Sequence, residues 1–189
     1  LQIIRTGQKL AQSTPAPARE FPPVVRKQVF ECLPPHPRPF QQRIFIPSDA
    51  MVELRDIRVT NISKKPLEID IIPVVEYTHP DAVKQFTNAD WIPQTMQSKA
   101  VQDGEFTILV QYPFMFRDRK LNYFTSSRPA SSFETDRAKF LGQNEYGTWA
   151  RPAGLFAHEL GSREAFRGDN IAALLHPLGS IGSGETRCL

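Results

Sequence analysis

The side chains best suited to chemistry gather in one stretch of this 189-residue chain, between residues 76 and 97. The stretch holds His79, Asp81, Asp90 and Trp91 among further aromatic and amide residues. An indole face stacks on the apolar face of a pyranose, and a neighbouring carboxylate accepts hydrogen bonds from sugar hydroxyls. Asp90 and Trp91 are therefore candidate substrate-binding residues for a carbohydrate. The alternative is that Trp91 fills the core beneath a loop.

His79 and Asp81 flank a proline and could form a catalytic pair or supply two metal ligands. A general base needs a nucleophile beside it, and a metal ion needs at least a third ligand; the sequence places neither nearby. We interpret His79 as a structural residue in a turn. We predict no catalytic residue and no metal site, and Cys32 and Cys188 are interpreted as ordinary thiols because they lack zinc-site spacing.

Trp149 is a third candidate for sugar contact, at the end of a glycine-containing segment. Packing in a turn that glycine permits is the other role for it, and the sequence favours that role. Glu134 with Asp136, or Glu145 with Glu159, could form the two carboxylates of a glycosidase. That chemistry needs carboxyl groups about 5 to 9 Å apart, which spacing along the chain does not determine.

Charge and hydropathy exclude two classes of partner. Residues 1–43 carry seven Lys and Arg against two Glu, so the rest of this +3 chain is slightly acidic. The basic part has prolines where a nucleic-acid surface needs aromatic platforms, so we expect no nucleic-acid partner. No stretch approaches the about 18 apolar residues of a membrane span, and the start lacks a signal-peptide pattern. We expect no membrane partner and a cytoplasmic protein.

The chain divides into a proline-rich segment and a region of short strands. Eight of the seventeen prolines fall between Pro15 and Pro39, which predicts a basic extended arm or linker over residues 1–42 with at most one strand, at 24–31. Residues 43–189 are expected to form an antiparallel all-β domain, most simply a β-sandwich. Strands are predicted at 43–47, 52–59, 67–71, 106–110 and 122–125, and short helices at 82–86 and 135–141.

Two details of the strand pattern are testable against the structure. Strands 52–59 and 67–71 are expected to pair as a hairpin with one wet face, with a bulge or twist around Asp56 where the apolar phase changes. Phe106, Ile108 and Val110 recur at every second position and are expected to share one face of their strand.

Several short motifs follow one another in an order typical of one family. They are Phe45-Ile46-Pro47, the run from Arg58 to Ser63, Glu76-Tyr77, the run from Asp136 to Gly142, that from Gly168 to Ala173, and Gly184-Glu185-Thr186. From about Arg43 to Leu189 the chain resembles the amino-terminal β-sandwich of the cellobiose phosphorylase family, glycoside hydrolase family 94, formerly glycosyltransferase family 36.

This resemblance implies a parent enzyme whose chemistry lies outside the chain. In the family a β-sandwich is joined to an (α/α)6 barrel, where an acidic residue protonates the glycosidic oxygen while inorganic phosphate attacks with inversion. The resemblance therefore implies no cofactor, phosphate and a β-glucan oligosaccharide as substrates, a sugar 1-phosphate as product, and a homodimer. Residues 43–189 would be an incomplete sandwich domain without the barrel, and no catalytic residue is assigned.

The segment from Tyr77 to Gln97 is similar to the β-1,2-glucan-processing branch of the family. Two other functions stay open. The chain could be a stand-alone carbohydrate-binding β-sandwich, in view of Trp91 and Trp149, or a purely structural dimerisation domain.

Overall fold

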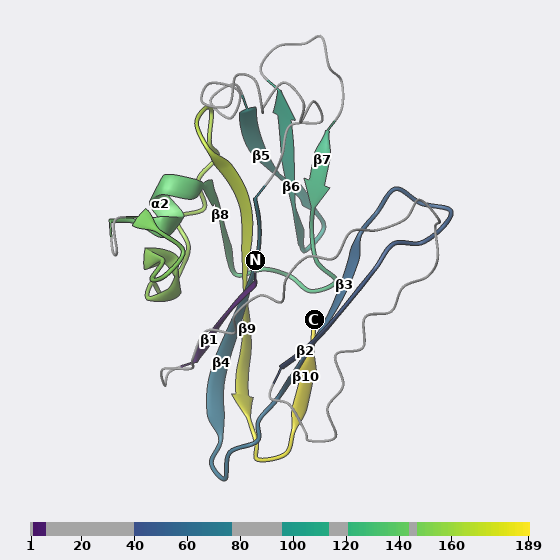
Figure 1. The fold of residues 1–189 in the computed structure, drawn as a ribbon, viewed down its shortest axis with the longest axis vertical. Helices are drawn as coiled ribbons and strands as arrows, with labels where there is room; N and C mark the ends of the chain where they lie inside the picture. The colour runs from purple at the N-terminus through teal and green to yellow at the C-terminus, as the bar shows by residue number, and fades with distance from the viewer. Residues whose placement is uncertain (1, 7–39, 77–95, 114–120, 144–146) are drawn as a thin grey trace. The chain divides into compact units, whose positions relative to one another are not determined.

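The computed structural model describes residues 2–6, 40–76, 96–113, 121–143 and 147–189, with the backbone alone for residues 2–6. Nearly all regular structure is antiparallel β, as predicted (Figure 1). The strands are β1 (Gln2–Thr6), β2 (Phe40–Phe45), β3 (Leu54–Thr60), β4 (Leu67–Glu76), β5 (Met96–Asp103), β6 (Phe106–Pro113), β7 (Asn122–Phe124), β8 (Ser132–Asp136), β9 (Asn170–Ile181) and β10 (Thr186–Cys188). The helix α2 spans Arg137–Leu141, and a 3₁₀ turn, η3, spans Ala153–Leu155.

The strands form three sheets with the orders β1-β4-β9-β8, β5-β6-β7 and β10-β3-β2. The chain makes two compact units: Leu1–Arg5 with Ile69–Pro177, and Thr6–Glu68 with Leu178–Leu189. The first unit holds the sheet β5-β6-β7 and most of β4, β8 and β9, and the second holds the sheet β10-β3-β2. The two units are described in turn.

Strand β9 is buried on both of its faces within the first unit. Ala172 and Leu174 point to one side, where they pack with Leu109 of β6. The next residues in the alternation, Ile171 and Ala173, point to the other side and join the cluster beneath α2. The two sheets of this unit therefore pack face to face as a sandwich, and α2 covers the opposite face of the β9 sheet, as Figure 1 shows for α2 beside β8 and β9.

The segment after η3 ties the two sheets together along their edges. It bonds to β8 and then to β5, mostly through backbone groups: Leu160 N to Ser132 Oγ at 2.9 Å, Ser162 N to Phe133 O at 2.7 Å, Thr135 Oγ1 to Arg163 O at 2.8 Å, and Ser98 N to Ala165 O at 2.8 Å. Edge strands with unpaired amide groups invite unwanted pairing, so this segment also covers two edges.

Asn61 organises the second unit. Its side chain is 1% exposed and makes four hydrogen bonds: Nδ2 donates to Lys65 O at 2.8 Å and Ile181 O at 2.7 Å, and Oδ1 accepts from Ser63 N and Ser63 Oγ. Gly184 N also donates to the Asn61 carbonyl at 2.7 Å. All four hydrogen-bonding positions of the amide are therefore used, and they fix the turn after β3 to the loop before β10.

The predicted hairpin between residues 52–59 and 67–71 is wrong. Strand β3 pairs with β2 and β10, whereas β4 lies in another sheet. The physical reason lies in the turn between them, where Asn61 bonds to Ile181 and closes the loop toward β9 and β10. The wetter face expected for each segment is present: exposed Arg58 lies between buried Ile57 and Val59, and Glu68 is exposed beside buried Ile69. Beyond the predicted segment, β4 is buried on both sides as far as Val74.

The bulge expected near Asp56 is also absent from the described β2–β3 pair. Its residues pair one for one from Phe40 opposite Val59 to Phe45 opposite Leu54. A register shift lies instead in β8, between Glu134 and Asp136. The apolar phase change in β3 reflects the exposed hairpin end, where Val52 and Leu54 are 42% and 41% exposed.

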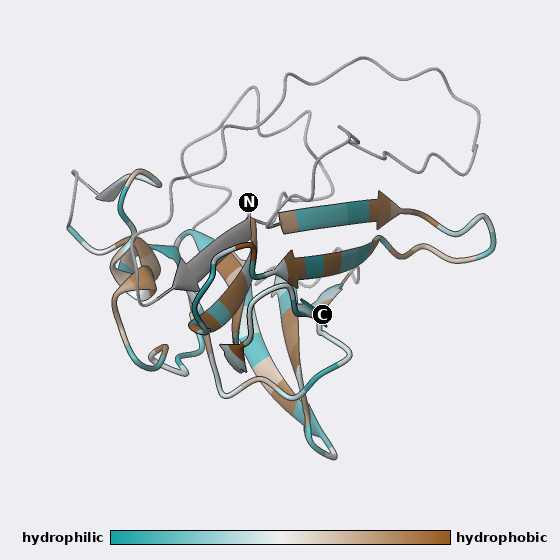
Figure 2. Cartoon of the chain, turned by 90° about the horizontal axis from the view of Figure 1, so that it is seen from below, coloured by the Kyte–Doolittle hydropathy of each residue, from teal (hydrophilic) through white to brown (hydrophobic). Residues whose placement is uncertain are grey.

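The alternation in β6 is confirmed, but the more buried face is the other one. Phe106, Ile108 and Val110 share a face and are half-buried, whereas Thr107 and Leu109 on the opposite face are buried. Figure 2 shows brown and teal residues alternating along strands. The helix expected at 135–141 is α2, while the strand at 24–31 and the helix at 82–86 lie outside the described residues. The expectation of at most one strand in residues 1–42, at 24–31, is wrong, because β1 lies at Gln2–Thr6, before the first proline, and β2 begins at Phe40, after the last proline of that run.

Candidate functional site

Of the residues that the sequence offers for sugar contact, the structure describes Trp149. Asp90 and Trp91 lie outside the described residues, as do His79 and Asp81. Trp149 is half-buried and packs on the core cluster beneath α2. Its ring lies 5.8 Å from that of Phe140, centroid to centroid, at an interplanar angle of 47°. Trp149 therefore packs on the core as the sequence favours, and its contact with sugar stays a prediction.

Trp149 also belongs to a polar cluster with Glu76 and Arg137. The indole Nε1 donates to Glu76 Oε1 at 3.1 Å, and Arg137 Nε donates to the same oxygen at 2.5 Å. The Arg137 guanidinium lies 5.8 Å from the centre of the Trp149 ring, within range of a cation–π contact. Within the described residues, Glu76 Oε2 accepts no hydrogen bond.

Local structure places the three side chains. Glu76 is the last residue of β4, so its side chain emerges where the strand ends. Arg137 is the first residue of α2, whose start is capped by Asp136: its Oδ1 accepts from Lys139 N at 3.0 Å. Gly142 ends this helix at φ 67°, a conformation that favours glycine, and a Cβ there would lie 2.6 Å from the Cβ of Ala153.

The cluster has the composition of a polar-ligand site at the surface. Glu76 is 47% exposed and Arg137 is 32% exposed, so both charged groups face water. An aromatic ring beside a carboxylate and a guanidinium can stack on a sugar and hydrogen-bond its hydroxyls. An ion pair this exposed adds at most about 1 kcal/mol to stability, so its polar groups stay available to a ligand.

The carboxylates considered for glycosidase chemistry have internal partners. Glu134, whose side chain is 3% exposed, accepts from the backbone N–H groups of Thr135 and Asp136 and pairs with Arg163 at 2.9 Å. Asp136 is occupied as the helix cap. Glu145 lies outside the described residues, and Glu159 is exposed at the surface.

A buried histidine that the sequence reasoning missed lies at the end of the β9 core run. His176 is 1% exposed; Nδ1 is 3.1 Å from Pro129 O, and Nε2 is 3.1 Å from Ser126 Oγ. A carbonyl only accepts, so Nδ1 carries a proton and donates to Pro129 O, while the Ser126 hydroxyl beside Nε2 donates to Arg128 O at 2.7 Å. Burial lowers the pKa of His176, the charge of Arg128 lowers it further, and the Pro129 hydrogen bond opposes both effects.

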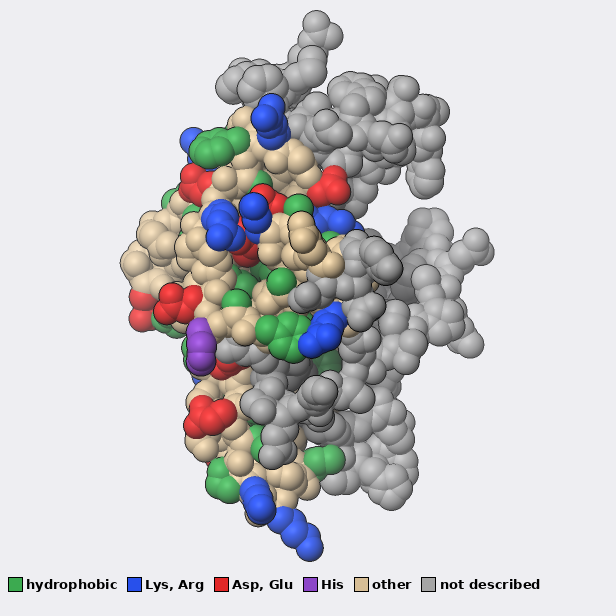
Figure 3. All heavy atoms as spheres, turned by 90° about the vertical axis from the view of Figure 1, so that its left-hand side faces the viewer, with side chains coloured by type: hydrophobic (Ala, Val, Ile, Leu, Met, Phe, Trp, Pro, Cys, Tyr) green, Lys and Arg blue, Asp and Glu red, His purple; other side chains and the backbone are tan. Residues whose placement is uncertain are grey.

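Two structural features are absent from the described residues. Within those ranges no group of three or more His, Cys, Asp or Glu could hold a metal ion, and no helix is long and apolar enough to cross a membrane. Figure 3 shows Lys and Arg interspersed with Asp and Glu on the face that carries α2. The visible charge on this face is mixed, unlike the basic stripe of a nucleic-acid surface.

Comparison with known families decides the classification. The model described as Glycosyl hydrolase 94, supersandwich domain, matches residues 40–189. The chain belongs to this family. The resemblance found in the sequence is thereby confirmed at the level of the glycoside hydrolase 94 supersandwich, and the β-1,2-glucan branch stays a prediction. No curated protein matches the chain.

The supersandwich should lose stability in mild acid through His176. Its folded-state pKa lies below the ordinary histidine value of about 6.5, so the unfolded chain binds the proton more readily. The free energy of unfolding should therefore fall as the pH drops below about 6.5 and level off once the pH is below the folded-state pKa. Urea unfolding between pH 7.5 and pH 5 should show this fall in the native chain.

The matched variant is His176→Gln, which keeps an amide able to donate and accept but does not titrate. The stability difference between the native chain and this variant should shrink as the pH is lowered. A difference that stays constant from pH 7.5 to pH 5 would contradict the assignment of a neutral buried imidazole.

Proposed function

We propose that this chain is the non-catalytic amino-terminal domain of an inverting glycoside phosphorylase. The parent enzyme cleaves a β-glucosidic bond of a glucan oligosaccharide with inorganic phosphate and releases a sugar 1-phosphate. The observation that carries the proposal is the glycoside hydrolase 94 supersandwich match over residues 40–189. In this proposal an (α/α)6 barrel of the same polypeptide supplies the general acid, phosphate is a co-substrate rather than a cofactor, and the enzyme works in the cytoplasm.

The environment of the described polar groups supports a non-catalytic role. An acid or base must reach the proton that it transfers, either directly or through one water. Glu134 is held by Arg163 and two backbone amides, Asp136 caps a helix, and His176 is 1% exposed against a loop. These groups serve the fold, so the chemistry of the parent enzyme belongs to the barrel.

The purified chain should release no sugar 1-phosphate from cellobiose, sophorose or laminaribiose mixed with inorganic phosphate, because it lacks the general acid and the phosphate site. The measurement is enzymatic detection of glucose 1-phosphate over hours at micromolar protein. The product of the complete open reading frame is the positive control and should be active on at least one such sugar. Robust phosphorolysis by the chain alone would contradict the proposal.

A sugar-contact role for the loops of this domain is the second candidate function. The observation that favours it is the exposed cluster of Glu76, Arg137 and Trp149. In sequence, Glu76 directly precedes the segment that contains the candidate residues Asp90 and Trp91. As a stand-alone binding module, or as the border of a site in the parent enzyme, this cluster would hold a β-glucan by stacking and hydroxyl hydrogen bonds.

Calorimetric titration of the chain with β-linked glucan oligosaccharides tests this role. We expect saturable binding that weakens about fivefold on Trp149→Ala or Trp91→Ala, since a stacked aromatic contact is worth about 1 kcal/mol. Glu76→Gln keeps the surface shape and should also weaken binding, because an uncharged oxygen accepts sugar hydroxyls less strongly. Phe156→Ala is the matched control, at an aromatic that is 60% exposed outside the cluster. The absence of heat at millimolar sugar would remove this role.

We further propose that the domain has a structural role in a homodimer of the parent enzyme. The support is the family assignment together with an apolar sheet face that stays partly exposed in the first unit, which includes Val101 and Tyr123.

A further inference from the structure

The outward face of the sheet β5-β6-β7 carries several apolar side chains, of which Val101 and Tyr123 are exposed. Residues directly opposite in antiparallel strands point to the same side, and Val101 lies opposite Ile108, while Lys99 and Tyr123 lie opposite Val110. The other side of the sheet packs on β9 through Leu109. These five residues therefore share the outward face, together with Phe106 and Tyr112.

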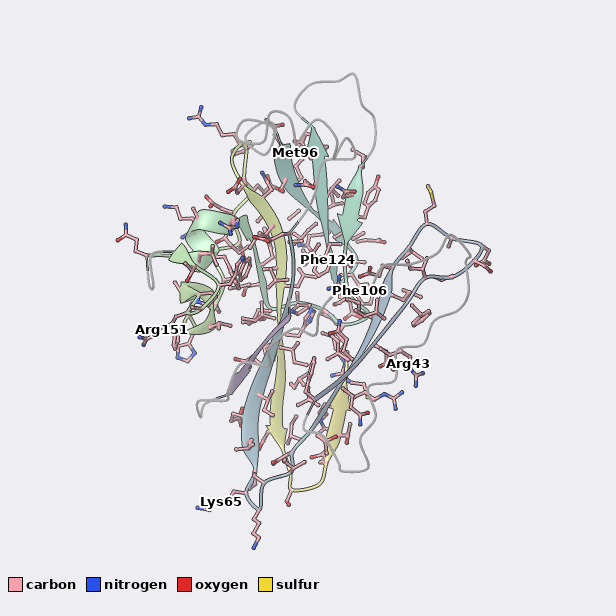
Figure 4. The ribbon with its side chains drawn as sticks, in the orientation of Figure 1. Arg43, Lys65, Met96, Phe106, Phe124 and Arg151 are labelled. Atoms are coloured by element: carbon pink, nitrogen blue, oxygen red, sulfur yellow. The ribbon has the colours of Figure 1, made fainter. Side chains whose placement is uncertain are left out.

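The outward face remains open to water. Val101 is 47% exposed and Tyr123 is 64% exposed, whereas Ile108 and Val110 are half-buried. Apolar rows of this kind are typical of a surface that meets another apolar surface. Figure 4 shows the length of the sheet, with Met96 at one end and Phe106 and Phe124 toward the other.

Two opposite charges flank the centre of this face. Lys99 and Asp103 lie on β5, two residues before and two residues after Val101, so all three side chains share the outward face. Within the described residues neither forms an ion pair; the Lys99 ammonium lies 5.9 Å from the centre of the Tyr112 ring. The face thus carries one unpaired charge of each sign at equal distances from Val101.

This arrangement is complementary to itself. Consider two copies of the sheet that face each other across a two-fold axis. The axis passes by Val101, lies in the plane of the interface and runs at right angles to the strands. Each residue of β5 then faces the residue that lies equally far from Val101 on its other side in the second copy. Lys99 then faces Asp103 of the partner subunit, Val101 faces its own copy, and Ile108 does the same. A foreign partner would need no such equal spacing of opposite charges.

We propose that the outward face of β5-β6-β7 binds the same face of a second copy, with reciprocal Lys99–Asp103 pairs on either side of Val101. The inference deepens the proposed dimerisation role and rests on it.

The size of the face sets the strength of the contact. Strands β5 and β6 have eight residues each and β7 has three. With about 3.4 Å per residue and about 4.8 Å between strands, their face covers roughly 310 Å². A standard interface buries about 800 Å² on each partner, so this contact is less than half of that area. The domain alone should therefore be in a concentration-dependent equilibrium between monomer and dimer.

Sedimentation equilibrium of the purified chain from 10 µM to 1 mM tests the proposal. Lys99→Asp and Asp103→Lys should each weaken association by at least tenfold at low salt, because like charges then face each other across the two-fold axis. An equimolar mixture of the two variants should associate again, since the acidic pair of one copy meets the basic pair of the other. Lys64→Asp, which makes the same charge change at an exposed turn, is the control and should associate like the native chain.

The possible results of the sedimentation experiment distinguish the proposed interface from the dimerisation role on which it rests. Association of the native chain that neither charge change weakens would overturn this face as the interface and leave the dimerisation role standing. Single variants that weaken association without recovery in the mixture would overturn the two-fold pairing. A chain that is monomeric throughout the range would overturn both the inference and the dimerisation role of the domain, while the phosphorolysis assay decides the enzyme class independently.

Discussion

Burial of β9 on both faces is the constraint on which the first unit depends. Ile171, Ala172, Ala173 and Leu174 are all 0% exposed, and successive side chains alternate between two separate clusters. This short run therefore joins the sheet β5-β6-β7 on one side to the helix layer on the other. The connection is strong because burying one large aliphatic side chain contributes about 1.5–3 kcal/mol. Asn170 at the start of the strand adds polar ties: Nδ2 donates to Met96 O at 3.0 Å, and Ser98 Oγ donates to Oδ1 at 2.5 Å.

The hydrogen bonds beside β9 explain why the buried polar side chains of β8 have a structural role. Ser132, Glu134 and Thr135 on β8 all bond to the segment that runs from Leu160 to Ala165. Burying such groups without partners would cost about 1–3 kcal/mol each, so the bonds are required once the strand is buried. These bonds hold the unit as a scaffold, in line with its assignment to the glycoside hydrolase 94 supersandwich.

Some elements of the fold could be predicted from the sequence because residues close together in the chain determine them. Phe106, Ile108 and Val110 alternate over a strand with one accessible face, and Thr135 to Leu141 contains the Asp136 cap of α2. Strand β9 could not be found in this way. A strand buried on both faces loses its alternation, and Pro177 and Gly179 within it are typical of a turn.

The pairing of strands that lie far apart in the sequence was the second feature that could not be predicted. Strand β3 pairs with β10 some 126 residues later, as in the contact between Thr60 and Thr186, so a local hairpin was the wrong inference. The candidate site shows the same limit: Trp149 could be singled out by its type, but Glu76 bonds to it across 73 residues. His176 was missed because the residues that contact its ring, Ser126 and Pro129, lie 50 and 47 residues away in the sequence.

Native-state hydrogen exchange tests most directly whether β9 holds the scaffold together. The backbone amides of Ala172, Ala173 and Leu174 should be the slowest in the chain and should exchange only with global unfolding, at a free energy equal to that from urea denaturation. The amides of the short edge strand β7 should exchange by local opening at a lower free energy. Exchange of the β9 amides at the same free energy as those of β7, well below the global value, would contradict the account.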